Sequence, residues 1–255
     1  MSEQTPTPAT AYKSSDQDES GWLPEGRGVE AGQGWTWISE GFSLFMKNPL
    51  IWIVITVLLA VIMIVLNFIP FLGQLAGHLL TPVFGAGLML GCQALRSGGT
   101  LEVTHLFEGF KQRTSELIVL GLLYMVGVVI IGVAVFAVVG GSVMSGFMMG
   151  HRGGAGVAVG GVMLGALLAL ALCVPLAMAT WFATPLVLFN KLAPIDAMKA
   201  SFFACLKNIV PFLVYGVILF VLGVVAAIPF GLGFLVLIPV LIGSVYTTYR
   251  DVFYQ

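Results

Sequence analysis

The chain has 255 residues, of which 58% are hydrophobic and 9% charged, and its mean hydropathy is +1.02. Soluble domains usually contain about 25% charged residues, so this composition favours a protein that is solvated by lipid. The net charge of −1 and the lack of an aromatic–basic stripe give no support for nucleic-acid binding. The three cysteines lack CxxC spacing, which argues against a disulfide framework and a zinc site.

The first 30 residues predict a disordered cytoplasmic tail. They contain six acidic and two basic side chains, and they bury too little apolar surface to offset the entropy of the chain. The stretch GWLP at 21–24 is either a docking motif or a plain linker, and we favour the linker. No apolar stretch typical of a cleaved signal peptide is visible, so the first span is expected to act as an uncleaved anchor.

Long uncharged stretches predict the membrane spans. Residues 48–95 and 208–249 contain no Asp, Glu, Lys or Arg, and residues 117–190 contain only Arg152. Each stretch is long enough for two helices of about 20 residues. Residues 31–255 are therefore predicted to form an all-α, polytopic membrane domain whose six transmembrane helices pair as three hairpins, at 50–69, 77–95, 116–139, 161–189, 209–228 and 232–249.

A short amphipathic helix is predicted before each hairpin, at the membrane interface. In EGFSLFMKNPLIWI, at 40–53, aromatic residues precede Lys47, and Pro49 suits the first turn of the span. Related stretches begin at Thr104 and at Asp196. The expected interface anchors are Trp35, Trp37, Phe42, Phe45, Lys47, Phe110, Phe202 and Lys207.

Recurring motifs predict an internal repeat. Lys-Asn occurs at 47–48 and again at 207–208, and Glu-Gly-Phe occurs at 40–42 and again at 108–110. The second helix of each hairpin also carries a proline, in LLTPVF, FATPLV and LIPVLI. We interpret these patterns as three units of interfacial helix plus hairpin, with an insertion in the middle unit, at about 35–97, 103–191 and 195–250.

The distribution of positive charge predicts the orientation. Of the 11 Lys and Arg residues, all but Arg152 lie in the N-terminal region, around the connections between spans 2 and 3 and spans 4 and 5, or at the C-terminus. Because Lys and Arg concentrate on the cytoplasmic side, both termini are predicted to be cytoplasmic. The chain is therefore expected to cross a membrane several times.

Four runs of the chain carry a family resemblance: VEAGQGWTWISEGFSLFMKNPLIWI, LLTPVFGAGLMLGC, HLFEGF and IPFGLGFLVLIPVLIGSVYTTYRDVF. Together they resemble an uncharacterised family of bacterial six-helix integral membrane proteins, over about residues 29–254. More loosely, the build is similar to the membrane domain of glycerophosphodiester phosphodiesterases. The resemblance implies a bacterial inner-membrane protein and implies no catalytic residue.

Prolines within the spans are the first candidates for a functional site. A proline frees a backbone carbonyl in the bilayer, so it serves either as a packing kink or as part of a binding cavity. We favour packing, and the residues concerned are Pro82, Pro175, Pro185, Pro211 and Pro239. A polar group near the outer end of the first hairpin either lines a crevice or forms interfacial hydrogen bonds, and it comprises Asn67, Gln74 and His78.

An outer loop rich in glycine and methionine is the second candidate. Thioethers and imidazole are ligands for Cu(I), although methionine is also a common apolar filler, and we favour the latter interpretation. The residues are Met144, Met148, Met149 and His151. Two pairs with GxxxG spacing mark expected close helix contacts, either within one chain or between two chains: Gly87 with Gly91 and Gly161 with Gly165.

These patterns favour a non-enzymatic membrane protein without a cofactor. The sequence contains no HExxH, GxSxG or P-loop motif, and its histidines, serines and cysteines do not converge in any arrangement that we can place. We favour a structural, scaffold or accessory component that contacts membrane lipid and packs with itself or another membrane protein. The alternative is a binder or transporter of lipid or another apolar small molecule. A crevice among the proline-bearing helices would favour this alternative.

Overall fold

The structure is a computed structural model that describes residues 21–70, 72–150 and 154–255. Its described residues form helices and no strand, apart from one isolated bridge between Trp22 and Tyr254. The helices are α1 (Gln33–Lys47), α2 (Pro49–Asn67), α3 (Leu72–Arg96), α4 (His105–Glu108), α5 (Thr114–Met149), α6 (Gly154–Trp181), α7 (Ala183–Phe189), α8 (Pro194–Lys207), α9 (Ile209–Ala227) and α10 (Phe234–Phe253).

The predicted all-α membrane fold is confirmed. The described residues contain six segments long and apolar enough to cross a membrane: α2, α3, α5, α6 continued by α7, α9 and α10. They follow one another as three hairpins, α2–α3, α5–α6 and α9–α10, and a shorter helix precedes each one. Pro49 begins α2, as expected, and Asn48 separates α2 from α1.

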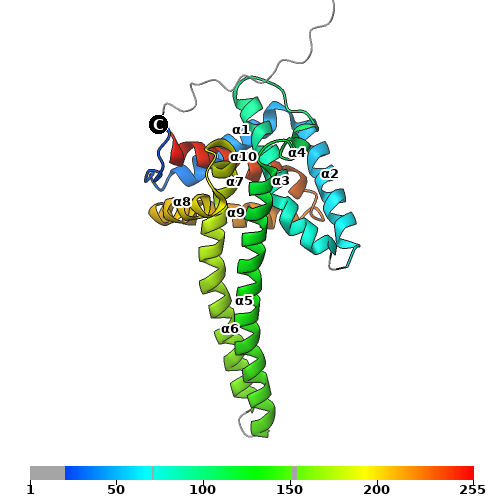
Figure 1. Cartoon of the computed structure of the whole chain (residues 1–255), viewed down its shortest axis with the longest axis vertical. Coiled ribbons are helices and arrows are strands. Elements are labelled where there is room, and N and C mark those ends of the chain that lie inside the picture. The colour runs from blue at the N-terminus through cyan, green and yellow to red at the C-terminus, as the bar shows by residue number, and fades with distance from the viewer. Residues whose placement is uncertain (1–20, 71, 151–153) are drawn as a thin grey trace, which may run out of the picture.

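The middle hairpin is longer than predicted. Its first helix was expected to end near residue 139, yet α5 continues to Met149 and α6 already begins at Gly154. The two helices touch at this end, where Gly146 lies against the backbone of Gly154. Glycines at both positions permit this contact, so the segment that we predicted as a loop is helical in its described part. Figure 1 shows the hairpin projecting well beyond the other helices.

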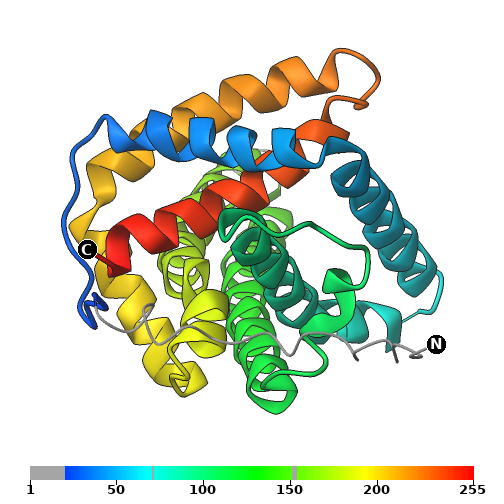
Figure 2. The ribbon, with the colours of Figure 1, turned by 90° about the horizontal axis from the view of Figure 1, so that it is seen from above.

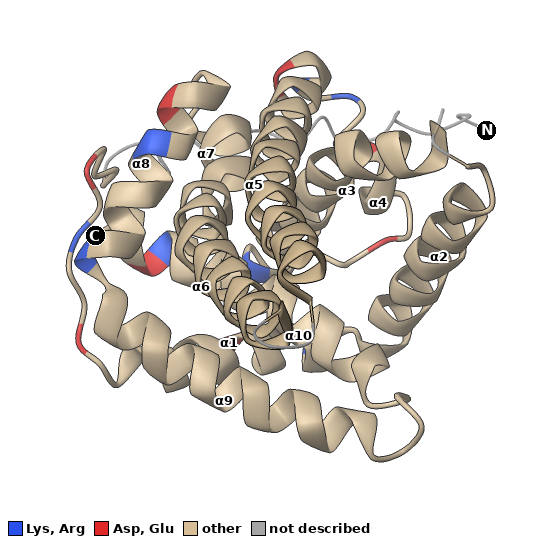
Figure 3. Cartoon of the chain, turned by 90° about the horizontal axis from the view of Figure 1, so that it is seen from below, with Lys and Arg blue, Asp and Glu red and all other residues tan. Residues whose placement is uncertain are grey.

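The three hairpins do not run parallel to one another. The α5–α6 hairpin follows the long axis of the molecule, whereas α9 lies across that axis (Figures 1 and 3). Most charged residues belong to the helices and loops around the middle hairpin (Figure 3). Within its described residues, that hairpin has only Glu116, at the start of α5. The described part of the projecting half is therefore an uncharged, apolar surface.

Each short helix packs against the second helix of a different hairpin. Helix α1 lies along α10, as Figure 2 shows, while α4 packs on α3 and α8 packs on α6. Units that are consecutive in the chain thus contact one another, and the contact of α1 with α10 joins the first unit to the third. The three units therefore close on themselves, and the predicted internal repeat stays a prediction.

One small residue makes the equivalent contact in each unit. Gly41 lies over the carbonyl of Val240 and the amide of Ser244, and Gly109 lies over the carbonyl of Val83 and the amide of Gly87. Ser201 replaces glycine in the third unit. Its hydroxyl donates to the Met178 carbonyl at 2.6 Å and accepts from the Phe182 N–H at 2.9 Å. In all three cases the contacted carbonyl and amide are four residues apart on one helix.

These contacts correct one part of the predicted repeat. Pro82 and Pro239 each precede the contacted carbonyl, which belongs to Val83 or Val240. In the middle unit that carbonyl belongs to Met178, so the residue equivalent to the two prolines is Ala177. Pro185 instead lies in the separate helix α7. The proline match was wrong there because it was based on spacing across an insertion rather than on contacts.

The N-terminal segment is ordered from residue 21, which corrects the prediction of a disordered tail up to residue 30. Leu23 donates its N–H to the Phe253 carbonyl at 2.8 Å, and Arg27 donates its N–H to the Val252 carbonyl at 2.8 Å. The GWLP stretch thus docks on the C-terminal end of the same chain rather than acting as a plain linker. Backbone hydrogen bonds to α10 hold it there, and the remaining predicted tail, 1–20, lies outside the described residues.

Candidate functional site

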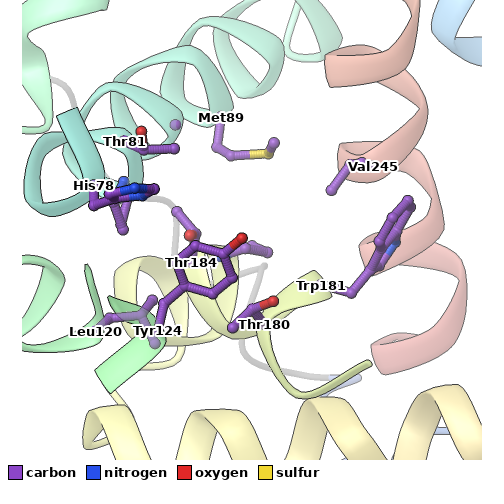
Figure 4. Close-up of a pocket in the computed structure, with 12 residues that line it drawn as sticks. His78, Thr81, Met89, Leu120, Tyr124, Thr180, Trp181, Thr184 and Val245 are labelled. Atoms are coloured by element: carbon purple, nitrogen blue, oxygen red, sulfur yellow. The ribbon is translucent and has the colours of Figure 1, made fainter. Parts of the chain in front are cut away.

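A cavity of about 450 Å³ lies among the second helices of all three hairpins. Its volume falls within the range of small-molecule sites in proteins. Figure 4 shows residues around it, with His78 and Tyr124 on one side and Trp181 on the other. The helices that contribute are α3, α5, α6, α7 and α10, and the lining residues are His78, Thr81, Pro82, Gly85, Met89, Leu120, Tyr124, Thr180, Trp181, Thr184, Pro185 and Val245.

A break between α6 and α7 forms one wall of the cavity. Helix α6 ends at Trp181, and the N–H of Phe182 is taken by the Ser201 hydroxyl of α8. Pro185 follows within the first turn of α7, where a missing N–H costs little. The contact that joins the second and third units therefore also positions Thr184 and Pro185 at the cavity.

The cavity walls are mainly apolar, with a few polar groups. The hydroxyls of Thr81 and Thr180 donate to carbonyls of their own helices, Gly77 at 2.7 Å and Leu176 at 3.0 Å. The rings of His78 and Tyr124 lie 6.1 Å apart, and neither forms a hydrogen bond with another residue in the described part of the chain. These two side chains are therefore available to the polar end of a ligand.

Trp181 connects the cavity to the aromatic core. Its ring lies 5.7 Å from that of Phe212 and 5.9 Å from that of Tyr215, in both cases edge to face. Its indole N–H is buried and has no hydrogen-bond partner among residues 21–70, 72–150 and 154–255. Buried donors are nearly always satisfied in native proteins, so this N–H is a candidate to donate to a ligand or to water.

The five candidate prolines fall into two groups. Pro82 and Pro185 line the cavity, as the cavity interpretation required. Pro175 is exposed on α6, and Pro239 is buried in α10 without lining the cavity. Pro211 is also buried, and its carbonyl faces Gly34 of α1. These three prolines therefore lie between packed helices or on the surface, and none of them lines the cavity.

The predicted glycine pairs mark close contacts within the chain. Gly87 and Gly91 lie against residues of α4 and the loop that precedes it. Gly161 and Gly165 lie against Ser142 and Val139 of α5. Both pairs are buried between helices of one molecule, so the close approach that GxxxG spacing predicts occurs within the chain.

The candidate metal ligands lie at the far end of α5, on a helix rather than on the predicted loop. Met144, Met148 and Met149 are exposed, and His151 lies outside the described residues. The described residues contain no group of three or more His, Cys, Asp or Glu side chains that could hold a metal ion. Copper binding by the methionines, the alternative that we did not favour, is not tested by these positions.

The expected interface anchors divide between the surface and the core. Trp35, Phe42 and Phe110 are exposed and remain candidates to contact lipid. Trp37 and Phe45 are buried instead, because α1 packs on both α9 and α10. The remaining anchors also contact other parts of the protein. Lys47 donates to the Leu95 carbonyl and Lys207 donates to the Glu25 carbonyl. Phe202 is half-buried.

Sequence reasoning missed most of the cavity. Thr81 and Thr184 each precede one of the two lining prolines, and Thr180 lies four residues before Thr184, across the break between α6 and α7. Hydroxyl residues beside prolines in apolar spans were a signal that could have been used. Tyr124 and Trp181 had no comparable signal, because a single aromatic residue in an apolar run is usually part of the core.

Comparison with known proteins identifies one relative. A probable inner membrane protein of Burkholderia thailandensis is 31% identical over 215 residues, which cover 80% of this chain and 77% of that protein. No family model and no solved structure matches the chain. The similarity to the membrane domain of glycerophosphodiester phosphodiesterases therefore stays a prediction, whereas the match to a bacterial membrane protein agrees with the six apolar helices.

Proposed function

This chain belongs to the same family as the probable inner membrane protein of Burkholderia thailandensis, and we propose that it binds a lipid or another apolar small molecule within the membrane. The observation that carries this proposal is the cavity of about 450 Å³ lined by residues from all three hairpins, with Pro82 and Pro185 among them. Ligand sites between membrane helices commonly form where helices are broken or kinked.

The cavity walls indicate what kind of ligand would fit. Met89, Leu120 and Val245 offer apolar surface, whereas His78 and Tyr124 offer an imidazole and a hydroxyl. A mainly apolar pocket with a few polar groups orients a ligand through its polar end. We therefore propose an amphiphile with one hydrogen-bonding end and an apolar body, bound without chemical change.

A structural or accessory role is the second candidate. It is supported by the projecting part of the α5–α6 hairpin, where Phe136 is 78% exposed and Phe147 is 81% exposed. Such a surface needs a cover of lipid or of another membrane protein. This role and ligand binding are compatible, since the cavity lies at the other end of the hairpin, beside Leu120 and Tyr124 of α5.

We also propose that both termini face the cytoplasm of the bacterium. The proposal follows from the ten Lys and Arg residues on one side and Arg152 alone on the other. An introduced cysteine in Arg152→Cys should react with a membrane-impermeant thiol reagent in intact cells. An introduced cysteine in Lys111→Cys, on an exposed loop, should react only after permeabilisation. The reverse pattern would overturn the orientation.

Native Cys205 is a poor reporter in this labelling experiment. It is only 4% exposed, and burial raises the pKa of its thiol to about 12. The thiolate is the reactive species, so this thiol stays protonated and slow to react over the usual pH range. Unmodified protein should accordingly show no labelling of Cys205 on either side of the membrane.

Filling the cavity tests ligand binding directly. A Cβ at Gly85 would meet only the Thr184 methyl group, at 3.6 Å, so Gly85→Leu should fold and extend its side chain into the cavity. We expect at least about a tenfold loss of bound apolar ligand, because displacing contacts worth about 1.4 kcal/mol already corresponds to that factor. The measurement is native mass spectrometry of protein released from membrane vesicles.

Gly216→Leu is the matched control for this experiment. Gly216 is exposed on α9, where an added Cβ meets no atom within 4 Å. This variant should retain ligand as the unmodified protein does. If the unmodified protein carries only bulk lipid, or if Gly85→Leu retains its ligand undiminished, the proposed binding function is wrong.

A further inference from the structure

The apolar cavity has a direction, with two of its polar groups at one end. Along α3, its lining residues run from His78, near the start of the helix, to Met89, nearer the end at Arg96. Their separation in the sequence corresponds to about 16 Å along the helix axis, at about 1.5 Å per residue. The ring of Tyr124, from α5, lies 6.1 Å from that of His78, so a second polar side chain lies at the same end.

The polar end of the cavity is its open end, and apolar side chains flank the opening. His78 is exposed, whereas Met89 is only 6% exposed. Leu75 precedes His78 by three residues and Val128 follows Tyr124 by four, so each lies on the same helix face as its polar neighbour. Both Leu75 and Val128 are exposed. In a membrane-spanning chain such an opening faces hydrocarbon, so a ligand would enter sideways from the bilayer.

The cavity wall carries no acidic side chain, lysine or arginine among its described lining residues. Glu116 lies one turn before Leu120 on α5, but it does not line the cavity and it pairs with Arg113 at 2.9 Å. Burying an ionised group costs far more free energy than burying a neutral polar group, unless the ion is paired. The wall therefore selects against a ligand whose polar end is charged.

The polar groups at the opening suit an uncharged hydroxyl or ester. A neutral imidazole and a phenol can each donate and accept a hydrogen bond. The Thr81 hydroxyl already donates to the Gly77 carbonyl at 2.7 Å, so its oxygen is left to accept. A hydroxyl or ester group at this end could therefore satisfy its own donors and acceptors without any ion pair.

We infer, building on the proposed binding function, that the ligand is a lipid with an uncharged polar end. That end lies at His78 and Tyr124, and an apolar chain extends toward Met89. Helix α3 ends at Arg96, and Lys47 donates to the neighbouring Leu95 carbonyl, so these charges mark one side of the membrane. The polar end of the cavity lies toward the opposite end of α3, so the lipid comes from the leaflet away from these charges.

The experiment uses the full-length protein in phosphatidylcholine bilayers that contain equal amounts of a diacylglycerol and of the phosphatidic acid with the same acyl chains. We expect native mass spectrometry to show at least about tenfold more diacylglycerol retained, because the phosphate charge would be unpaired in the cavity. Combining His78→Leu with Tyr124→Phe should lower diacylglycerol retention about tenfold, through the loss of two neutral hydrogen bonds. Asn67→Leu, at an exposed polar residue outside the cavity, is the control and should retain the lipid.

Two results would overturn the inference. One is retention of phosphatidic acid equal to or above that of diacylglycerol, and the other is undiminished retention of diacylglycerol in the double variant. If Gly85→Leu still displaces the retained lipid in either case, the proposed binding function stands and only the ligand class is wrong. Retention of neither lipid above the bulk level would contradict both.

Photo-cross-linking of the unmodified protein tests the orientation without any substitution. A diacylglycerol that carries a diazirine at the end of one acyl chain should label the residues around Met89. Labelling confined to the residues around His78 and Tyr124 would contradict the proposed direction of the lipid in the cavity.

Discussion

Replacing Gly41 by leucine should destabilise the protein by about 3 kcal/mol or more, since overpacking of this kind typically costs 1–3 kcal/mol even without backbone overlap. A Cβ on Gly41 would lie 2.5 Å from the Val240 carbonyl oxygen and 2.6 Å from the Ser244 amide nitrogen. Both atoms belong to the backbone of α10, so a side-chain rotation cannot relieve the overlap. Helix α1 would have to move away from α10, and the contact that joins the first unit to the third would open.

The measurement is thermal unfolding in detergent, with Gly32→Leu as the control. Gly32 immediately precedes α1, and an added Cβ there meets no atom within 4 Å. Gly109→Leu should resemble Gly41→Leu, because Gly109 contacts the backbone of α3 in the equivalent way. If Gly41→Leu unfolds at the same temperature as Gly32→Leu, then close packing of α1 on α10 is not what holds the first unit in place.

Removing the side chain of Asn208 should cost about 3 kcal/mol, because several buried hydrogen bonds at about 1 kcal/mol each are lost together. This side chain is fully buried. It accepts from the Val29 N–H at 2.8 Å and donates to the carbonyls of Arg27 and Ala204, both at 2.9 Å. Asn208→Ala therefore releases the N-terminal segment from the junction of α8 and α9, in addition to lowering the stability of the whole chain.

Trypsin cleavage after Arg27 separates the local effect from the global one. The Arg27 N–H and side chain both bond to the end of α10, so the unmodified protein should resist cleavage there. In Asn208→Ala, cleavage should become faster at temperatures where the helices remain folded. Cleavage at an unchanged rate would contradict the idea that Asn208 holds this segment.

Asn48→Ala is the control because Asn48 occupies the equivalent position in the first unit. It too ends one helix and begins the next, and it follows Lys47 as Asn208 follows Lys207. Its side chain forms no hydrogen bond with another described residue. We therefore expect a change of no more than about 0.5 kcal/mol, as at an ordinary surface site.

The comparison of Asn48 with Asn208 illustrates how far sequence patterns extend. The repeated Lys-Asn pair correctly predicted two helix junctions, because the end of a helix depends on a few neighbouring residues. The different bonding of the two asparagines could not be predicted, because the partner of Asn208 is the segment around Val29, 179 residues away in the chain. Similarly, the prediction that the aromatic residues of α1 contact lipid was only partly correct. Trp37 is buried, and its indole N–H donates to the Asp251 carboxylate.

The number, order and approximate position of the six apolar helices followed from the sequence by itself. Hydropathy and uncharged length are local properties, and lipid allows few structures other than helices for such segments. Membership of a bacterial membrane-protein family followed from the same residues. The contacts at Gly41, Gly109 and Ser201, the docked segment 21–30 and the cavity were decided only by the tertiary structure. Each depends on which helices face one another, and residues of similar apolarity can pair in many ways until their shapes are compared in three dimensions.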